Sequence, residues 1–169
     1  MEKLLIVVDM QNDFVTGVLG TNEAQTIVSD VADFVKNFDG KVIFTRDTHD
    51  ENYLETQEGK KLPVPHCIKG SDGWQIVPEL LPFVNDSNVI DKPTFGSLAL
   101  SDFLKENDFA EIELCGVCTG ICVISNAVIA KATRPNTPVS VLSNLCACVT
   151  PDSHNTALEA MKTCHIDII

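Results

Sequence analysis

The chain has 169 residues, of which 44% are hydrophobic and 21% are charged, and its formal net charge is −12. This composition is typical of a globular protein and excludes a disordered chain, and the acidic balance argues against nucleic acid or an anionic membrane as a partner. No apolar run approaches the roughly 20 residues that cross a bilayer, and the N-terminal segment lacks the features of a signal peptide. We therefore expect a cytoplasmic protein with one domain over residues 1–169.

Short apolar runs alternate with segments of helical spacing along the chain. The first run, 3–9, is continuously apolar until Asp9, as in a central strand of a parallel sheet. Thr21 and Ser97 are placed to cap two of the helices. This alternation predicts an α/β domain with a mostly parallel sheet of about six strands. The expected strands are 3–9, 41–46, 88–91, 112–117, 138–143 and 166–169, and the expected helices are 21–38, 97–106, 121–130 and 151–164, the last capped by Asp152 or Ser153.

Two segments lack a regular period. Residues 10–20 are expected to form a loop, and residues 48–78 form a longer polar segment that contains several Gly and Pro residues. A loop of that length in a compact domain is usually functional or disordered, and its aromatic and cysteine residues argue against disorder. Residues 77–83 are expected to hold a short helical turn.

The segment 111–133 joins a buried strand to a helix through the turn 116–120. Open α/β sheets place their ligands at the end of the strand where such a turn lies. Cys122 falls in the first turn of the expected helix, where free N–H groups and the helix dipole favour a thiolate. The alternative is that Cys122 is a small buried hydrophobic residue, as free cysteines often are.

Asp9 and Lys92 lie at the ends of two other expected strands. The carboxyl ends of parallel strands meet at one edge of a sheet, so Asp9, Lys92 and Cys122 could lie together. A nucleophilic thiol needs a base to take its proton and a positive charge to stabilise its thiolate. Taken singly, Asp9 is typical of a turn residue and Lys92 of a solvated loop lysine. The coincidence of all three at one edge favours a nucleophilic cysteine site.

A second polar cluster begins where the strand 41–46 ends, with Asp47 and His49, and His66 follows in the long loop. Side chains two residues apart in an extended segment lie on one face. A carboxylate and two imidazoles suit Zn, Fe or Mn and leave positions open for water or substrate. The alternative is that both histidines are surface groups. No such setting surrounds His154, expected in a first helical turn, or His165, expected in a loop.

Three motifs give the chain a strong resemblance to the isochorismatase-like cysteine hydrolases, and within them to the nicotinamidases, also called pyrazinamidases. Residues 9–14, DMQNDF, resemble the family's DxQNDF, and residues 91–93, DKP, resemble its lysine segment. Residues 116–123, GVCTGICV, are similar to its GVxTxxCV. Cys118 stands where the family usually has Ala, and Gly120-Ile121 where it has Asp-Tyr.

The resemblance implies a three-layer α/β/α fold with a catalytic triad. In that triad Asp9 is the base, Lys92 stabilises the thiolate and Cys122 is the nucleophile. Backbone N–H groups of Cys118 and Cys122 would form the oxyanion hole. The Val117–Cys118 peptide corresponds to one that is cis in the family.

The segments 45–49 and 62–70 resemble the metal-binding segments of nicotinamidases. The resemblance implies one divalent metal ion, with zinc expected first and iron or manganese as alternatives. In some members a Glu or a His between the two segments is a further metal ligand. In this chain either a Glu or water is expected to complete the coordination shell of the metal. The implied ligands are Asp47, His49, His66 and the candidate Glu58.

The resemblance implies hydrolysis of nicotinamide to nicotinate and ammonia through a cysteine thioester, a reaction of NAD salvage. Phe14, Phe95 and Trp74 are candidates to line the pocket of the ring, with core packing as the alternative for each. The second candidate function is a related cysteine hydrolase acting on another small amide or carbamoyl substrate. Two further alternatives are a redox protein that uses the thiols of Cys118 and Cys122, and a binding module without catalytic activity. Because the family often forms oligomers, a homo-oligomer is one option.

Overall fold

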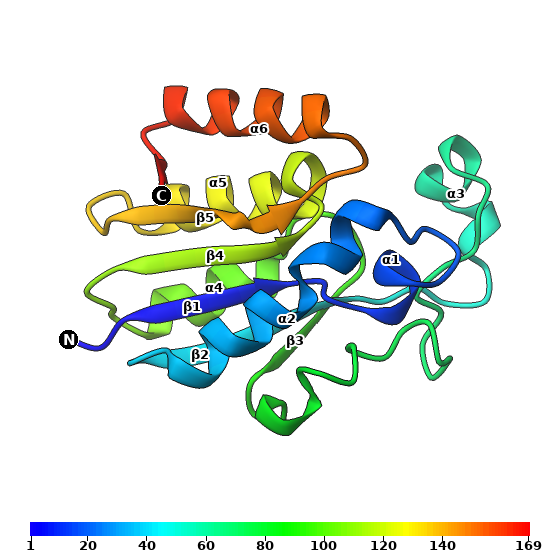
Figure 1. The fold of residues 1–169 in the computed structure, drawn as a ribbon, viewed down its shortest axis with the longest axis horizontal. Helices are drawn as coiled ribbons and strands as arrows, with labels where there is room; N and C mark the ends of the chain where they lie inside the picture. The colour runs from blue at the N-terminus through cyan, green and yellow to red at the C-terminus, as the bar shows by residue number, and fades with distance from the viewer.

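The computed structural model describes residues 1–169 and contains one six-stranded sheet. Its strand order is β3-β2-β1-β4-β5-β6, so β1 and β4 lie at its centre (Figure 1). Every pair of neighbouring strands is parallel, which confirms the predicted α/β class. The strands are β1 (Leu4–Val8), β2 (Lys41–Asp47), β3 (Val89–Lys92), β4 (Ile112–Val117), β5 (Val139–Ala147) and β6 (Asp167–Ile168).

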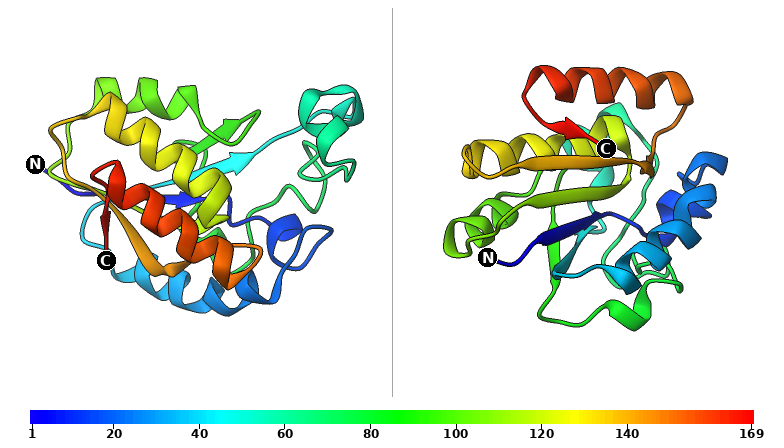
Figure 2. Two further views of the ribbon diagram at one scale, coloured as in Figure 1. Left: turned by 90° about the horizontal axis from the view of Figure 1, so that it is seen from above. Right: turned by 60° about the vertical axis from the view of Figure 1, so that its left-hand side comes forward.

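Helices cover both faces of this sheet and complete the three layers. Helix α2 packs on one face against β4 and β5, whereas α4 and α5 pack against each other on the opposite face, with α6 beside α5 (Figure 2). Right-handed crossovers explain the division, because the connection from β1 to β2 crosses the sheet in the opposite direction to those through α4, α5 and α6. The helices are α2 (Asn22–Asn37), α4 (Leu98–Glu106), α5 (Ile124–Thr133) and α6 (Pro151–Thr163).

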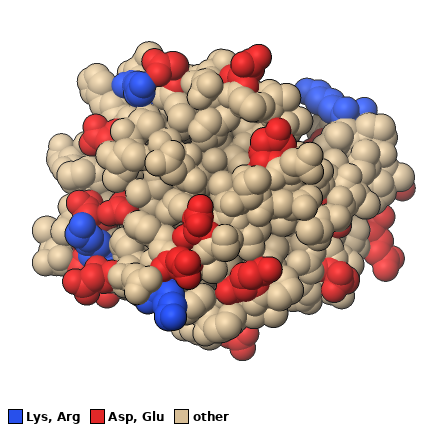
Figure 3. All heavy atoms as spheres, viewed as in Figure 1, with Lys and Arg blue, Asp and Glu red and all other residues tan.

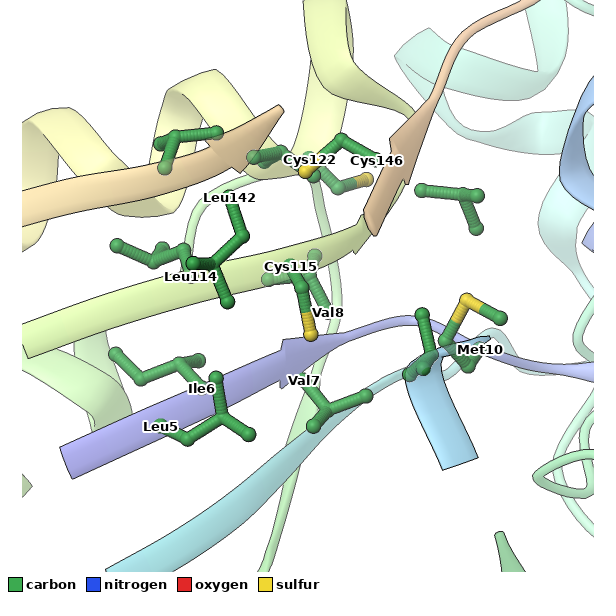
Figure 4. Packing of buried hydrophobic residues seen from close by; sticks show 14 of the residues in the cluster. Leu5, Ile6, Val7, Val8, Met10, Leu114, Cys115, Cys122, Leu142 and Cys146 are labelled. Carbon is green, nitrogen blue, oxygen red and sulfur yellow. The ribbon is translucent and has the colours of Figure 1, made fainter. Parts of the chain in front are cut away.

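The central strands explain the continuous apolar runs of the sequence. All five residues of β1 are fully buried, because helices cover the sheet on both sides. The side chains of Leu5, Ile6, Val7 and Val8 lie beside those of Leu114 and Cys115 in β4 (Figure 4). The functional side chains described below extend from the ends of this packed centre.

The helix caps agree with the sequence in two cases and differ in the third. Thr21 accepts a hydrogen bond from the backbone N–H of Ala24, and Ser97 one from that of Leu100, as predicted. Helix α6 is capped by Thr150, and the prediction of Asp152 or Ser153 is wrong. Pro151, which lacks an N–H group, suits the first helical position, so the cap is the residue before it. The Ser153 hydroxyl instead completes a capping box with Thr150.

Both expected loops contain regular structure that their sequences did not indicate. The segment 10–20 includes α1 (Asn12–Val15), and the segment 48–78 includes η1 (Tyr53–Glu55) and α3 (Gln57–Lys61), while η2 (Leu81–Phe83) is the predicted short turn. These helices are too short for a periodic apolar face to show in sequence. Of two isolated bridges, Gln11 with Ile76 joins the long segment to the residues after β1, and His49 with Ile68 pairs two parts of the long segment itself.

The surface agrees with the acidic composition. Asp and Glu side chains are spread over the face seen in Figure 3, among few Lys or Arg side chains. No helix combines the length and the apolar character needed to span a membrane. The cytoplasmic location and the homo-oligomer stay predictions.

Candidate active site

The carboxyl ends of β1, β2, β3 and β4 carry the polar side chains that the sequence singled out. Asp9 directly follows β1, Asp47 ends β2 and Lys92 ends β3. Cys122 lies in η3 (Thr119–Val123), the π-helical turn between β4 and α5. All four residues are buried, with Asp9 and Lys92 having at most 1% of their surface exposed.

Lys92 lies between the carboxylate of Asp9 and the thiol of Cys122. Its Nζ is 2.6 Å from Asp9 Oδ2 and donates a hydrogen bond of 3.6 Å to Cys122 Sγ. Asp9 Oδ1 accepts a hydrogen bond of 2.7 Å from the Thr45 hydroxyl. Asp9 Oδ2, despite the short ion-pair distance, has no partner in hydrogen-bond geometry. This oxygen can therefore accept a proton from the thiol.

Burial sets the protonation of these groups. It raises the pKa of Asp9, and the charge of Lys92 offsets only part of the effect. Burial and the Asp9 carboxylate together raise the pKa of Cys122 well above that of an ordinary thiol, although Lys92 acts in the opposite direction. Burial alone would lower the pKa of Lys92, but the charges around it raise that pKa instead. Burial and Asp9 thus favour the neutral form of the Cys122 thiol, against the effect expected of the helix end.

The turn before Cys122 is built for close approach of the backbone. Gly116 has φ of +116°, and a Cβ there would lie 2.1 Å from the carbonyl oxygen of Val8. The Val117–Cys118 peptide is cis. The Cys118 carbonyl accepts hydrogen bonds from the N–H groups of Ile121 and Val123, whereas no backbone hydrogen bond uses the N–H of Cys118 itself. That N–H is available to a developing oxyanion.

Beside the triad, two carboxylates and two imidazoles point their donor atoms at one another. Asp47 Oδ2 lies 2.9 Å from His49 Nε2 and 3.5 Å from His66 Nε2, and Glu58 Oε1 lies 3.6 Å from both imidazole nitrogens. The four donor atoms lie within 4.8 Å of one another. The His66 Nδ1 contacts the Val64 carbonyl at 2.8 Å, which leaves Nε2 facing the cluster. This donor set fits a divalent metal ion.

Asp47 belongs to both groups. Its Oδ1 lies 3.3 Å from Lys92 Nζ, while its Oδ2 faces the two histidines. Burial would raise the pKa of Asp47, but the hydrogen bonds of His49 and His66 and the charge of Lys92 hold it well below its usual range. Asp47 is therefore ionised, as a metal ligand must be.

Cys122 and three of the four metal-ligating side chains, Asp47, Glu58 and His66, line one cavity of about 450 Å³. A larger polar hollow of about 700 Å³ lies beside α1, but neither the thiol nor the metal group lines it. Of the three candidates for the ring pocket, Phe14 and Phe95 line the smaller cavity, whereas Trp74 does not. The Trp74 ring instead lies against the guanidinium of Arg46, at 3.5 Å from carbon to ring centroid. The apolar lining side chains are Phe14, Leu19, Leu62, Phe95, Ile121 and Val149.

A family model described as isochorismatase domain matches residues 3–169. The chain belongs to the isochorismatase family. An uncharacterized isochorismatase family protein of Bacillus subtilis is 35% identical over 144 residues, covering 76% of this chain and 78% of that one. Among solved structures, the pyrazinamidase of Pyrococcus horikoshii in complex with zinc has 28% identity and a TM-score of 0.84, covering 100% of this chain and 99% of that chain. The nicotinamidase/pyrazinamidase of Bacillus subtilis has 30% identity and a TM-score of 0.81, covering 99% of both.

Two further residues of this isochorismatase site were missed by sequence reasoning. Asn126 in α5 is fully buried, and its amide donates to the carbonyls of Cys122 at 2.8 Å and Phe95 at 3.0 Å. Its Oδ1 accepts from the Ser97 N–H at 3.0 Å, so one side chain joins the nucleophile turn to the segment after Lys92. The available signal was a lone amide among apolar residues of the expected helix 121–130.

His154 also contributes more than its position in α6 suggested. Its Nδ1 lies 2.8 Å from the hydroxyl of Thr119, which is fully buried in the turn before the nucleophile. This contact ties α6 to that turn. A sequence alone gives no sign of it, because the two residues are 35 positions apart.

Proposed function

We propose that this protein is a nicotinamidase, which hydrolyses nicotinamide to nicotinate and ammonia in NAD salvage. The observation that carries the proposal is one cavity lined both by Cys122, which Lys92 joins to Asp9, and by members of the four-residue metal-ligating cluster. The names of the solved structures of Pyrococcus horikoshii and Bacillus subtilis support the same activity.

In the first half of the reaction, Asp9 Oδ2 takes the proton of the Cys122 thiol. The ammonium of Lys92 stabilises the thiolate, whose sulfur attacks the amide carbonyl carbon. The carbonyl oxygen becomes an oxyanion, which the backbone N–H groups of Cys118 and Cys122 receive. Loss of one such donor can slow a reaction by roughly two to three powers of ten.

In the second half, the protonated Asp9 returns its proton to the amide nitrogen as the C–N bond breaks. Ammonia leaves, and the acyl group remains on Cys122 as a thioester. Asp9, again ionised, takes a proton from water as the water oxygen attacks the thioester carbon. The carboxylic acid is released and the proton returns to the thiol. Because burial raises the pKa of Asp9, one carboxyl group can serve as base and as acid.

Asp47, His49, His66 and Glu58 are the proposed ligands of one divalent ion, with zinc favoured by the Pyrococcus horikoshii structure and iron or manganese as alternatives. When bound, such an ion supplies a coordination position for the pyridine nitrogen and so orients the ring. The aromatic side chains of Phe14 and Phe95 face the same cavity and are proposed to pack against the ring.

The direct test is ammonia release from nicotinamide by the zinc-loaded protein and by Cys122→Ala. We expect turnover by the parent protein and a loss of at least about a thousandfold in the variant, because its attacking atom is gone. Equal melting temperatures would show that the variant is folded. If the protein releases ammonia from another small amide but not from nicotinamide, the assignment of the triad stands and the proposed substrate is wrong.

A further inference from the structure

Gln11 is a buried amide that neither the triad nor the metal cluster uses. It lies two residues after Asp9, directly before α1, and its side chain has no exposed surface. Burial of an amide is costly unless its hydrogen-bonding groups are paired. The partners of Gln11 therefore indicate what it does.

Those partners are backbone groups of β2 and of the long segment. Gln11 Oε1 accepts from the N–H of Asp47 at 2.7 Å, and Nε2 donates to the carbonyl of the same residue at 2.8 Å. Its second N–H donates to the carbonyl of Trp74 at 2.9 Å. The amide thus pairs with both backbone groups of Asp47, as a neighbouring strand would, and uses both of its donors.

We propose that Gln11 is a positioning residue that holds the metal ligand Asp47 and the Trp74 segment in place beside Asp9. This inference rests on the metal site of the proposed function. Asp47 Oδ2 faces the two histidines and Oδ1 faces Lys92, so a rotation of the Asp47 backbone would disturb both groups. Fixing the N–H and the carbonyl of one residue restrains that rotation. Partners that orient ligands typically change metal affinity by about 10- to 100-fold when they are lost.

The side-chain chemistry explains why glutamine is suited to this position. A carboxylate would place an oxygen against the two carbonyl oxygens that Nε2 now contacts. An apolar side chain would leave the Asp47 N–H and two carbonyls buried without partners. Asparagine has the same amide but is one methylene shorter.

Asn126 provides a matched control. Like Gln11, it is fully buried and makes three hydrogen bonds to backbone groups, but these hold the turn of Cys122 rather than the metal ligand. Gln11→Met and Asn126→Leu each remove three such bonds. Each replaces the amide by an apolar side chain of similar size and adds no charge. A general effect of lost buried hydrogen bonds would be the same in both variants.

The test is titration of the metal-free proteins with Zn²⁺ by calorimetry, followed by kcat and KM for nicotinamide at saturating Zn²⁺. We expect Gln11→Met to bind Zn²⁺ about 10- to 100-fold more weakly and to regain kcat when saturated. Asn126→Leu should bind Zn²⁺ as the parent does and keep a low kcat at every Zn²⁺ concentration. Equal Zn²⁺ affinity in Gln11→Met and the parent would overturn the inference, as would an equal loss in both variants.

If Gln11→Met does not fold, Gln11→Glu replaces it. The added negative charge would by itself strengthen binding of a cation, so a weaker affinity in this variant supports the positioning role despite that charge. Unchanged or stronger Zn²⁺ binding by Gln11→Glu would overturn it. A parent protein that binds no Zn²⁺ would reject the metal site itself, whereas failure of the Cys122→Ala test would reject the hydrolase.

Discussion

The ammonium nitrogen of Lys92 lies 2.6 Å from Oδ2 of Asp9, and neither side chain is exposed to solvent. A buried ion pair of this kind contributes little net stability, but removal of one partner typically costs about 3–5 kcal/mol because the other charge is left unpaired. The pair also sets the electrostatic surroundings of Cys122, whose sulfur is within 3.6 Å of the same nitrogen. Besides burial, which raises the pKa of the thiol most, the negative Asp9 raises that pKa and the positive Lys92 lowers it.

Asp9→Asn tests this balance. Because the Asp9 carboxylate raises the pKa of the Cys122 thiol, its removal leaves the positive Lys92 as the dominant neighbour and lowers that pKa. We expect alkylation of Cys122 by iodoacetamide at neutral pH to become faster, while ammonia release is lost with the base. Mass spectrometry of the labelled peptide measures the rate. Slower alkylation in Asp9→Asn than in the parent would contradict the assignment.

The pH profile of kcat/KM gives a second test of Asp9. The base must be ionised to accept the thiol proton, and burial raises its pKa above the ordinary value of 3.8. Activity is therefore expected to be complete above the raised pKa and to be lost as the pH falls through it. A limb that falls only near pH 3.8, with folding verified by the fluorescence of Trp74, would show that burial does not control this group.

The sequence was sufficient for the parts of the site that lie at strand ends. Asp9, Asp47 and Lys92 each end a run whose apolar character indicates a buried parallel strand, and such strands bring their carboxyl ends to one edge. Side chains that contact each other only in the folded structure, without lying at strand ends, had no comparable pattern in the sequence. The Trp74 ring was expected in the cavity, but it stacks on Arg46, whose side chain also pairs with Asp91.

The same limit applies to local structure. Helix α3 has only five residues, too few for a helical period to appear in sequence, yet it carries the candidate ligand Glu58. The position of Cys122 at a helix end was one of the features expected to favour its thiolate. Burial and a neighbouring carboxylate outweigh that effect, and both depend on residues far away in the chain.

Cys118→Ala separates the hydrolase from a redox protein. Cys118 is proposed to contribute only its backbone N–H, which alanine also has. Burial and the neighbouring Cys148 raise the pKa of the Cys118 thiol to about 12, so it is a poor thiolate at neutral pH. We expect kcat/KM for ammonia release within about threefold of the parent, the size of a small packing change. Complete loss of activity would support a mechanism that requires both thiols.

Gly116→Ala tests the turn before the nucleophile. A Cβ at this position would lie 2.1 Å from the carbonyl oxygen of Val8 in β1, and the φ of +116° is strained for any L side chain. The backbone of β4 must shift, and the Cys118 N–H moves with it. We expect the free energy of unfolding to fall by about 2 kcal/mol or more and kcat to fall with it. Denaturant unfolding provides the measurement, and a variant of parental stability and activity would contradict this account.

Glu58→Gln decides whether a carboxylate completes the metal shell. Glu58 Oε1 lies 3.6 Å from the Nε2 atoms of His49 and His66, and the side chain is half-buried at the edge of the cavity. An amide oxygen is a weaker ligand for a divalent ion than a carboxylate, so we expect Zn²⁺ to bind at least about tenfold more weakly. At limiting Zn²⁺ the KM for nicotinamide should rise, because the ion is proposed to orient the ring, whereas kcat at saturating Zn²⁺ should change little. Glu55→Gln is the matched control, since it removes one exposed carboxylate from the same segment and should bind Zn²⁺ as the parent does. Equal Zn²⁺ affinity in Glu58→Gln and Glu55→Gln would show that water, not Glu58, completes the shell.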